Sequence, residues 1–310
     1  MKNSRIVVIG SSNVDLIMKM DHLPEPGETV TDAEFFQVYG GKGANQAVAA
    51  ARAGGTVSFI NCVGEDAYTP EMVENYKKDG IDTTFLFHEK GIPSGHALIM
   101  IGDDGENCIS VAPGANYRLT PGKIDQAITL IEDAAIIILQ FEILPETIRH
   151  VLDLAGEHQI PVLWNFAPAR EFDLKYLDKV GILVVNEVEA GFLAGISINN
   201  IHDAEQASRI LLQKGVGSVV LTLGDKGAMM MDPKERIHVP AFPVKAVDTT
   251  SAGDVFCGTY AVALTEGRPQ EEALRFACAA SALCVTRMGA QPSAPSREEI
   301  ENFISGDTPG

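Results

Sequence analysis

Six short apolar runs, separated by segments of helical pattern, constrain the fold of this chain more than any other feature. Each run is apolar throughout, without alternating polar residues, which is typical of parallel strands covered on both faces. The intervening segments 144–159 and 203–215 carry the amphipathic pattern of surface helices. We therefore predict an α/β fold with a doubly wound, mostly parallel central sheet flanked by helices. The six runs are 5–10, 57–64, 134–142, 161–167, 181–187 and 218–224.

Two segments, 14–39 and 94–112, interrupt this pattern. The first contains no clear helix and includes the turn sequence PEPGE, and the second resembles a hairpin around Gly-Asp-Asp-Gly. Together they predict a small β-sheet, inserted in the α/β core and placed over its active edge. The chain has no low-complexity segment and no clear internal repeat, so residues 1–310 are expected to form a single domain.

The strongly acidic composition limits the partners that the surface can attract. A formal net charge of −18 repels nucleic-acid backbones and anionic lipid, so neither nucleic acid nor membrane is expected as a partner. The five cysteines are odd in number, lack C-x-x-C spacing and lie mostly in apolar runs, which indicates reduced thiols. The first residues resemble no signal peptide, and no apolar segment reaches about 18 residues. We expect a cytoplasmic protein.

Polar residues follow several of the apolar runs. Because ligands of open parallel sheets bind beyond the carboxyl ends of the strands, these residues are candidates for a binding pocket. A single polar residue at a strand end is more often a cap or a turn, but many on one edge favour a pocket. They are Asn13, Asp15, Glu142, Asn165, Asn186, Glu189, Thr222 and the stretch 248–254.

The glycine-rich stretch 39–55 has two interpretations. It contains Gly40, Gly41 and Gly43 around Lys42 and leads into a helix of small side chains. It either forms a tight turn into a closely packed helix, or it lets the backbone approach a ligand that Lys42 and Asn45 contact. No stretch matches a P-loop, a dinucleotide-binding motif or a zinc-binding cluster.

Gly253 and Asp254 stand where a second helix is predicted to begin. The free N–H groups of a helix start bind anions, and a glycine lets an anion approach the main chain. The same amides would hold the Asp254 carboxylate ionised, with a lowered pKa. Asp254 as a base and the Ala252–Gly253 amides as an anion hole would together form a phosphoryl-transfer device. The alternative is a favourable first-turn charge, which does not explain the neighbouring glycine.

With these residues identified, the chain resembles the ribokinase (PfkB-type) family of sugar kinases almost from end to end. The resemblance implies a ribokinase-like fold with a β-sheet lid, and transfer of the ATP γ-phosphate to the 5-hydroxyl of D-ribose. The motifs that carry it are GSSNVD (10–15), PGETV (26–30), GGKGANQAVAAARAG (40–54), DGEN (104–107), NFAPAR (165–170), NEVEA (186–190), TLGDKG (222–227), AVDTTSAGD (246–254) and VTRMGAQPS (285–293).

The resemblance also implies roles for individual residues on the sugar side. Asp254 would be the catalytic base, and the amides of Ala252 and Gly253 would form the anion hole. The lid would exclude water and pair two subunits into a homodimer. The residues implied to hold the sugar are Asn13, Asp15, Gly41, Lys42, Asn45, Glu142 and Asp254, and those implied to cover it are Ala97, Ile99 and Val111.

On the nucleotide side, the resemblance implies ATP with Mg²⁺, which Glu189 would position through water, and K⁺ as an activating cation. Ser251 departs from the glycine that is usual in the family, and Phe166 and Cys278 are further departures. The implied ATP residues are Asn186, Glu189, Thr222, Gly224, Asp225, Gly227, Gly253 and Cys278. The implied K⁺ ligands are Asp248, Thr250, Cys284, Arg287, Gly289 and Ser293.

Two alternatives stay open at this point. The first is a sister kinase that acts on 2-deoxyribose, another sugar or a nucleoside, although Asn13 and Asp15 favour a full set of ribose hydroxyls. The second is a non-catalytic sugar-binding protein. The intact Gly253–Asp254 pair argues against this second alternative.

Overall fold

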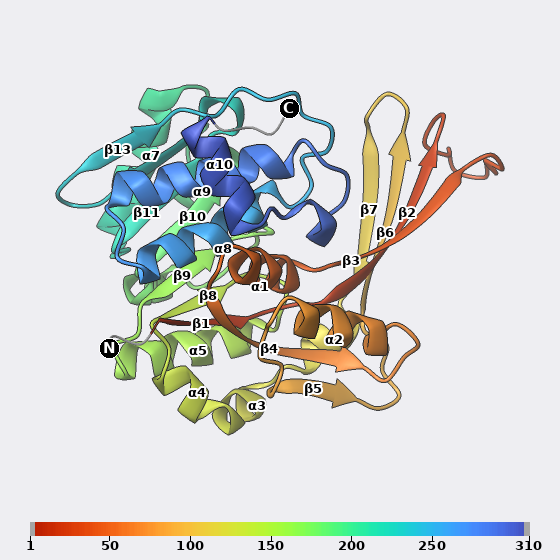
Figure 1. Cartoon of the computed structure of the whole chain (residues 1–310), viewed down its shortest axis with the longest axis horizontal. Coiled ribbons are helices and arrows are strands. Elements are labelled where there is room, and N and C mark those ends of the chain that lie inside the picture. Colours follow the sequence, from red (N-terminus) through yellow and green to blue (C-terminus); the bar gives the residue numbers. More distant parts are fainter. Residues whose placement is uncertain (1–3, 307–310) are drawn as a thin grey trace.

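A nine-stranded sheet forms the centre of the molecule (Figure 1). The computed structural model describes residues 4–306, and within that range the strand order is β13-β12-β11-β10-β9-β8-β1-β4-β5. All neighbouring strands are parallel except at one edge, where β12 pairs antiparallel with both β11 and β13. The predicted mostly parallel sheet is confirmed. The strands are β1 (Arg5–Ile9), β4 (Thr56–Gly64), β5 (Leu86–Glu89), β8 (Ile136–Leu139), β9 (Val162–Asn165), β10 (Ile182–Asn186), β11 (Ser218–Thr222), β12 (Ala228–Met231) and β13 (Arg236–Val239).

Helices cover both faces of this sheet, as Figure 1 shows for α1 and α5 on opposite sides of β1. The strands are apolar throughout because alternate residues serve two cores: Ile6 and Val8 face one, and Val7 and Ile9 face the other. The first core packs α1 (Lys42–Arg52), α2 (Thr69–Lys78), α8 (Ala252–Thr265), α9 (Gln270–Cys284) and α10 (Arg297–Ser305). The second packs α3 (Pro121–Gln126), α4 (Ile128–Glu132), α5 (Pro145–Glu157), α6 (Glu187–Ala194) and α7 (Ile201–Gln213).

A second, four-stranded sheet projects from one side of these layers (Figure 1). It has the order β3-β2-β6-β7, in which only β2 and β6 are parallel. Its strands β2 (Asn13–Met20), β3 (Glu34–Gly40), β6 (Gly95–Gly102) and β7 (Asn107–Ala112) come from the two predicted segments. Since β2 starts shortly after β1 and β3 ends just before α1, the base of the small sheet lies at the carboxyl edge of the large one.

The observed elements differ from the sequence-based expectation mainly at the edges of the large sheet. The strands β5, β12 and β13 were not predicted, because each has only four residues and lacks a long apolar run. Within the described part of the chain, four 3₁₀ turns connect the main elements: η1 (Gly114–Arg118), η2 (Leu174–Lys179), η3 (Gly224–Lys226) and η4 (Gln291–Ser293). Across residues 4–306, every helix is too short or too polar to cross a bilayer.

Candidate active site

The glycine-rich turn brings the start of α1 against the end of β1. A Cβ on Gly43 would lie 2.5 Å from the backbone nitrogen of Ser11, so only glycine allows this approach. At this start, the backbone N–H of Lys42 donates to Glu142 Oε2 at 3.0 Å. The Ser11 hydroxyl donates to the same oxygen at 2.5 Å. The turn therefore packs a helix closely and also joins residues that follow β1 and β8 at the switch point of the sheet.

Asp254 lies in the first turn of α8 and is only 6% exposed. Asn45 Nδ2 donates to its Oδ2 at 3.0 Å, and Gln46 Nε2 donates to its Oδ1 at 2.9 Å. The prediction that helix-start amides lower the pKa of Asp254 is wrong. Burial raises this pKa, against the opposing effects of Lys42 and of the two side-chain amides on α1. A carboxylate with a raised pKa is a stronger base for a hydroxyl proton.

Lys42 provides the positive charge at the centre of the site. Burial by itself would lower the pKa of its ammonium group. Three carboxylates outweigh that effect and raise the pKa, in the order Asp254, Glu142 and Glu189. Lys42 therefore remains a cation and partly neutralises the surrounding acids.

Asp15 of β2 lies beside this cluster and is 8% exposed. Its pKa is raised to about 7 by burial first, and then by the charges of Glu142 and Asp254. The side chain leans over Gly40, where a Cβ would collide with Asp15 Oδ2. Carboxylates gathered in this way are good acceptors for the hydroxyl protons of a sugar.

The amide of Asn13 has a fixed orientation. Its Oδ1 accepts a hydrogen bond from Asn116 Nδ2 at 2.8 Å, and Asn116 Oδ1 in turn accepts from the backbone N–H of Ser12 at 2.9 Å. Because Ser12 N–H can only donate, both amides are oriented, and Asn13 is left with its NH₂ group to offer to a ligand.

Strands of the small sheet bring the three predicted sugar-covering residues onto one face. Asp15, Ala97 and Val111 are direct neighbours across β2, β6 and β7. Ile99 lies two residues further along β6 and therefore on the same face. Ala97 is buried, and Val111 is 51% exposed.

A cavity of about 170 Å³ joins Asp254 to several of the predicted nucleotide residues. Asn186 and Glu189 form a capping box at the start of α6, and Thr222 lies opposite Asn186 at the end of β11. A Cβ on Gly253 would meet nothing within 4 Å, so open space adjoins the start of α8. The lining residues are Lys42, Asn165, Ala167, Val184, Val185, Asn186, Glu189, Thr222, Ser251, Gly253 and Asp254.

Ser251 occupies the N-cap position of α8 with φ of 62°, a left-handed conformation that favours glycine. This geometry explains why glycine suits the position. The Ser251 hydroxyl accepts a hydrogen bond from Asn45 Nδ2 at 3.0 Å, although it does not cap its own helix. Asn45 therefore links Ser251 and Asp254 across the start of α8.

Four predicted nucleotide residues do not line this cavity. Gly224 and Asp225 belong to η3, and Gly227 ends that turn beyond the end of β11. Cys278 lies buried in α9, where burial raises the pKa of its thiol to about 12. These residues lie outside the cavity, and the thiol stays protonated at neutral pH.

The six predicted cation ligands meet around Asp248. Its carboxylate accepts hydrogen bonds from the backbone N–H groups of Thr250 and Gly289, both at 2.9 Å. Burial raises the pKa of Asp248, but these hydrogen bonds outweigh it and lower the pKa. Cys284 Sγ lies 3.1 Å from Ser293 Oγ, and the Cys284 carbonyl accepts from the N–H of Arg287. One carboxylate among carbonyl oxygens suits a monovalent cation. A metal site built from three or more His, Cys, Asp or Glu side chains is absent from residues 4–306.

Four polar residues of this region were not predicted from the sequence as site residues, namely Ser11, Gln46, Asn116 and Gln140. Gln46 and Gln140 are fully buried, and Asn116 is nearly so. A polar side chain on the Ala-rich helix 42–52 was the available signal for Gln46. Ser11 lies within the motif GSSNVD (10–15), whereas Asn116 and Gln140 gave no signal, because only the fold brings them beside the site.

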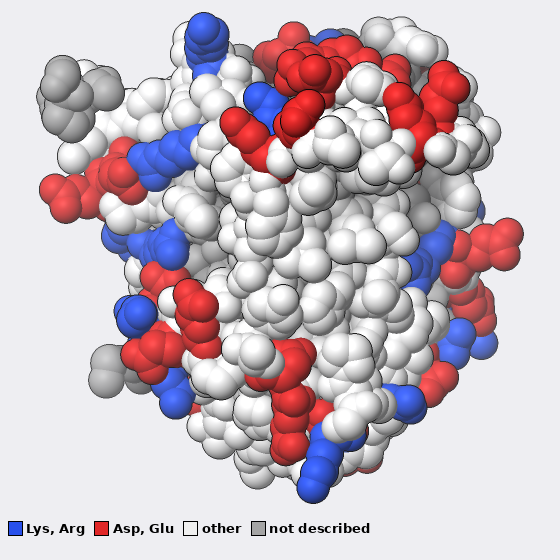
Figure 2. Space-filling view, turned by 90° about the vertical axis from the view of Figure 1, so that its right-hand side faces the viewer, with Lys and Arg blue, Asp and Glu red and all other residues white. Residues whose placement is uncertain are grey.

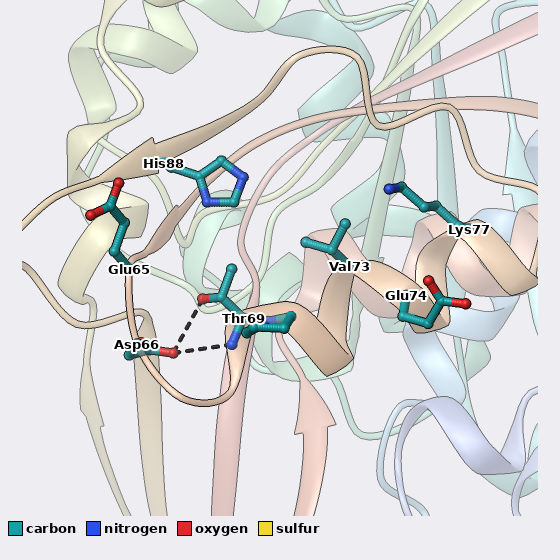
Figure 3. A pocket seen from close by; sticks show the side chains of 8 residues that line it. Glu65, Asp66, Thr69, Val73, Glu74, Lys77 and His88 are labelled. Carbon is teal, nitrogen blue, oxygen red and sulfur yellow. Dashed lines mark hydrogen bonds between the residues drawn. The ribbon is translucent and has the colours of Figure 1, made fainter.

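A second hollow, of about 430 Å³, lies away from these residues between α2 and β5 (Figure 3). Its most buried acid, Asp66, accepts hydrogen bonds from the N–H and hydroxyl of Thr69 and from the N–H of Ser94. These bonds hold the loop before α2, so the carboxylate serves the fold.

Comparison with known proteins places the chain in a family. Residues 3–297 match the family described as pfkB family carbohydrate kinase. A deoxyribokinase of Salmonella typhi is 38% identical over 97% of this chain and 98% of that protein. A ribokinase of Bacillus subtilis is 38% identical over 97% of this chain and 99% of that protein. The solved Arabidopsis thaliana ribokinase, complexed with ribose and ATP, superposes with a TM-score of 0.91 at 32% identity over 98% and 99% of the two chains. The chain therefore belongs to the pfkB family of carbohydrate kinases and is an enzyme of that family.

Proposed function

We propose that this chain transfers the γ-phosphate of ATP to the 5-hydroxyl of D-ribose, with Asp254 as the base. The observation that carries the proposal is the buried Asp254 carboxylate, which opens onto the same cavity as Lys42, Asn186 and Glu189. Asp254 would take the hydroxyl proton while the oxygen attacks the γ-phosphorus. The free amides around Ala252 and Gly253 would stabilise the charge that develops on the phosphoryl group.

Ribose is the favoured acceptor because the site offers many partners for hydroxyl groups. Asp15 and Glu142 supply acceptors, and Asn13 supplies a fixed donor. Asn45 Oδ1 is buried and has no hydrogen-bond partner among residues 4–306, so it can accept from a sugar hydroxyl. The related ribokinase that was solved with ribose and ATP supports this choice. Gly41 and Lys42 would complete the sugar site, and Ala97, Ile99 and Val111 would cover it.

A second candidate acceptor is 2-deoxyribose, because a deoxyribokinase is as similar to this chain as a ribokinase is. A buried group left unpaired by the missing hydroxyl costs about 1–3 kcal/mol, which gives about 5- to 150-fold discrimination. The ratio of kcat/KM for the two sugars therefore decides between the candidates.

The donor set of the cavity fits ATP with Mg²⁺. Glu189 offers one carboxylate beside the open start of α8, and Mg²⁺ prefers one or two carboxylates together with phosphates and water. When bound, Mg²⁺ would neutralise phosphate charge. Asn186, Thr222 and Gly253 would contact the nucleotide, together with the more distant Gly224, Asp225, Gly227 and Cys278.

We propose K⁺ as the activating cation at the Asp248 cluster, whose oxygen donors suit a large monovalent ion. The other ligands would come from Thr250, Cys284, Arg287, Gly289 and Ser293. The expected result is faster turnover in K⁺ than in a buffer that contains only tetramethylammonium. Asp248→Asn should reduce that difference.

The small sheet is proposed to act as a lid and as the contact between two subunits. Figure 2 views this side of the molecule and shows a broad area free of charged side chains below a rim of Asp and Glu. Exposed large apolar residues of the small sheet support its burial in a dimer. Phe36, Ile109 and Val111 share the face of Asp15, whereas Met18, Phe35 and Leu98 lie on the other face. We expect sedimentation to show a dimer and Leu98→Asp, on the face turned away from the sugar, to weaken it. A cytoplasmic location is also proposed, in keeping with five free cysteines.

The test is ADP release from MgATP in K⁺ buffer with D-ribose, 2-deoxyribose or adenosine as the acceptor. Release that depends on ribose and is lost in Asp254→Asn would support the proposal. Faster release with 2-deoxyribose or adenosine would assign a sister activity. No release with any acceptor would overturn the kinase assignment for these substrates and favour a sugar-binding role.

A further inference from the structure

Gln46 occupies an unusual position beside the proposed base. It lies in the second turn of α1, it is fully buried, and it does not line the cavity. Its Nε2 donates to Asp254 Oδ1 at 2.9 Å and to Asn165 Oδ1 at 3.1 Å. Its Oε1 accepts from Gln140 Nε2 at 2.7 Å. All the polar atoms of this side chain are therefore engaged, and none of them faces a substrate.

The chemistry of the partners fixes which way these amides point. An ionised carboxylate only accepts hydrogen bonds, so the nitrogen of Gln46 must face Asp254. Its oxygen then faces Gln140, whose nitrogen must donate in turn. Gln140 Oε1 has no hydrogen-bond partner among residues 4–306. A buried acceptor left unpaired is costly, which indicates that the position of Gln140 serves the orientation of Gln46.

We propose that Gln46, oriented by Gln140, is a positioning residue that holds the Asp254 carboxylate in place for proton transfer. The inference rests on the proposed role of Asp254 as the base. Gln46 fixes Oδ1, and Asn45 fixes Oδ2 from the preceding position of the same helix. The two amides thus set the plane of the carboxylate from one side and leave its other lone pairs for the substrate hydroxyl.

Gln46 also affects how readily Asp254 ionises. Burial and the acids around it raise the pKa of Asp254, and the hydrogen bonds from Asn45 and Gln46 act with Lys42 in the opposite direction. Loss of a donor to the charged form raises a carboxyl pKa. The titratable groups that face Asp254 are Lys42 of α1, Asp15 of β2, Glu142 after β8, Glu189 of α6, Cys257 of α8 and Cys284 of α9.

Two substitutions at position 46 separate this role from a merely structural one. Gln46→Met keeps the length of the side chain but removes the donor. The acid limb of the plot of kcat against pH should therefore move to higher pH by about one unit or more. Gln46→Glu keeps the shape and places a second carboxyl group against Asp254. The two groups would then share a proton, and the limb should move further. Sugar KM should change little in both variants, because Gln46 does not contact the cavity.

Thr147→Val is the matched control. Thr147 is also fully buried, and its hydroxyl donates to the carbonyl oxygen of Leu119 in the second core, away from the site. This change should lower stability without moving the pH profile. Should Gln46→Met fail to fold, Gln46→Glu and Gln140→Met provide the same test, with a smaller shift expected for Gln140→Met.

A second readout does not depend on the identity of the sugar. NMR titration of protein with ¹³C-labelled aspartate carboxyl groups, assigned with Asp254→Asn, reports the pKa of Asp254 directly. An upward shift in Gln46→Met supports the inference even if D-ribose proves to be the wrong acceptor. An unchanged titration, or a kcat loss at every pH together with an equal rise in KM, overturns it.

Discussion

Gly43→Ala tests the close approach on which the site is built. The added Cβ would lie 2.5 Å from the backbone nitrogen of Ser11 and 2.7 Å from Gly10 Cα, whereas ordinary contacts begin at 3.4 Å. Both neighbours are backbone atoms of the segment that follows β1 and cannot rotate away. The start of α1 must therefore shift by up to about 0.9 Å. Overpacking of this kind lowers the free energy of unfolding by about 1–3 kcal/mol.

The same shift should damage catalysis more than stability. Asn45 donates to Asp254, and the N–H of Lys42 donates to Glu142, both at 3.0 Å. A displacement of almost 1 Å takes these distances beyond hydrogen-bonding range. A misplacement of that size costs about 100-fold in rate.

Urea unfolding and sugar-dependent ADP release measure the two effects of Gly43→Ala. Gly122→Ala is the matched control, because a Cβ on this exposed helical glycine would meet nothing within 4 Å. It should leave activity unchanged and raise stability by about 0.4–1 kcal/mol. If Gly43→Ala retains both wild-type stability and wild-type turnover, the inferred packing of α1 on β1 is wrong.

Three further perturbations have defined outcomes. Because the pKa of folded Asp15 is raised to about 7, the folded state holds this proton more tightly than the unfolded chain, and stability should fall as the pH rises from about 4 to about 7. In Asp15→Asn, thermal unfolding measured across that pH range should no longer show this fall in stability. Lys42→Met leaves Asp254 and the other acids without their cation, so urea unfolding should show a loss of about 3–5 kcal/mol at pH 8 and a smaller one at pH 5. Asn116→Ala frees the Asn13 amide to rotate, and sugar KM should rise about tenfold with little change in kcat; an unchanged KM would refute the fixed orientation.

The sequence was sufficient to predict the general architecture, because that depends on local patterns. Continuous apolar runs predicted parallel strands buried on both faces, and the two irregular segments predicted the small sheet. Polar residues at strand ends, such as Glu142 and Asn186, indicated a binding pocket at one edge of the sheet, because the carboxyl ends of parallel strands meet there. The short antiparallel strands β12 and β13 escaped prediction because their pairing depends on the completed sheet.

The electrostatics of the site could not be predicted in the same way. The pKa of Asp254 was predicted from its place at a helix start, but burial raises it despite Lys42 and the hydrogen bonds from Asn45 and Gln46. Likewise, Gln140 lies 94 positions from Gln46 in the chain, and only the folded sheet brings their amides together. Side-chain networks of this kind follow from tertiary packing, on which local sequence patterns carry little information.

The proposed reaction is phosphoryl transfer from ATP to the 5-hydroxyl of D-ribose, with Asp254 as the base. Phosphorus NMR of the products from D-ribose and MgATP, for the wild type and for Asp254→Asn, tests it most directly. We expect a single sugar phosphate carrying its phosphate on O5, formed by the wild type and almost absent with the variant. A phosphate on another oxygen, no sugar phosphate at all, or equal formation by Asp254→Asn would contradict it.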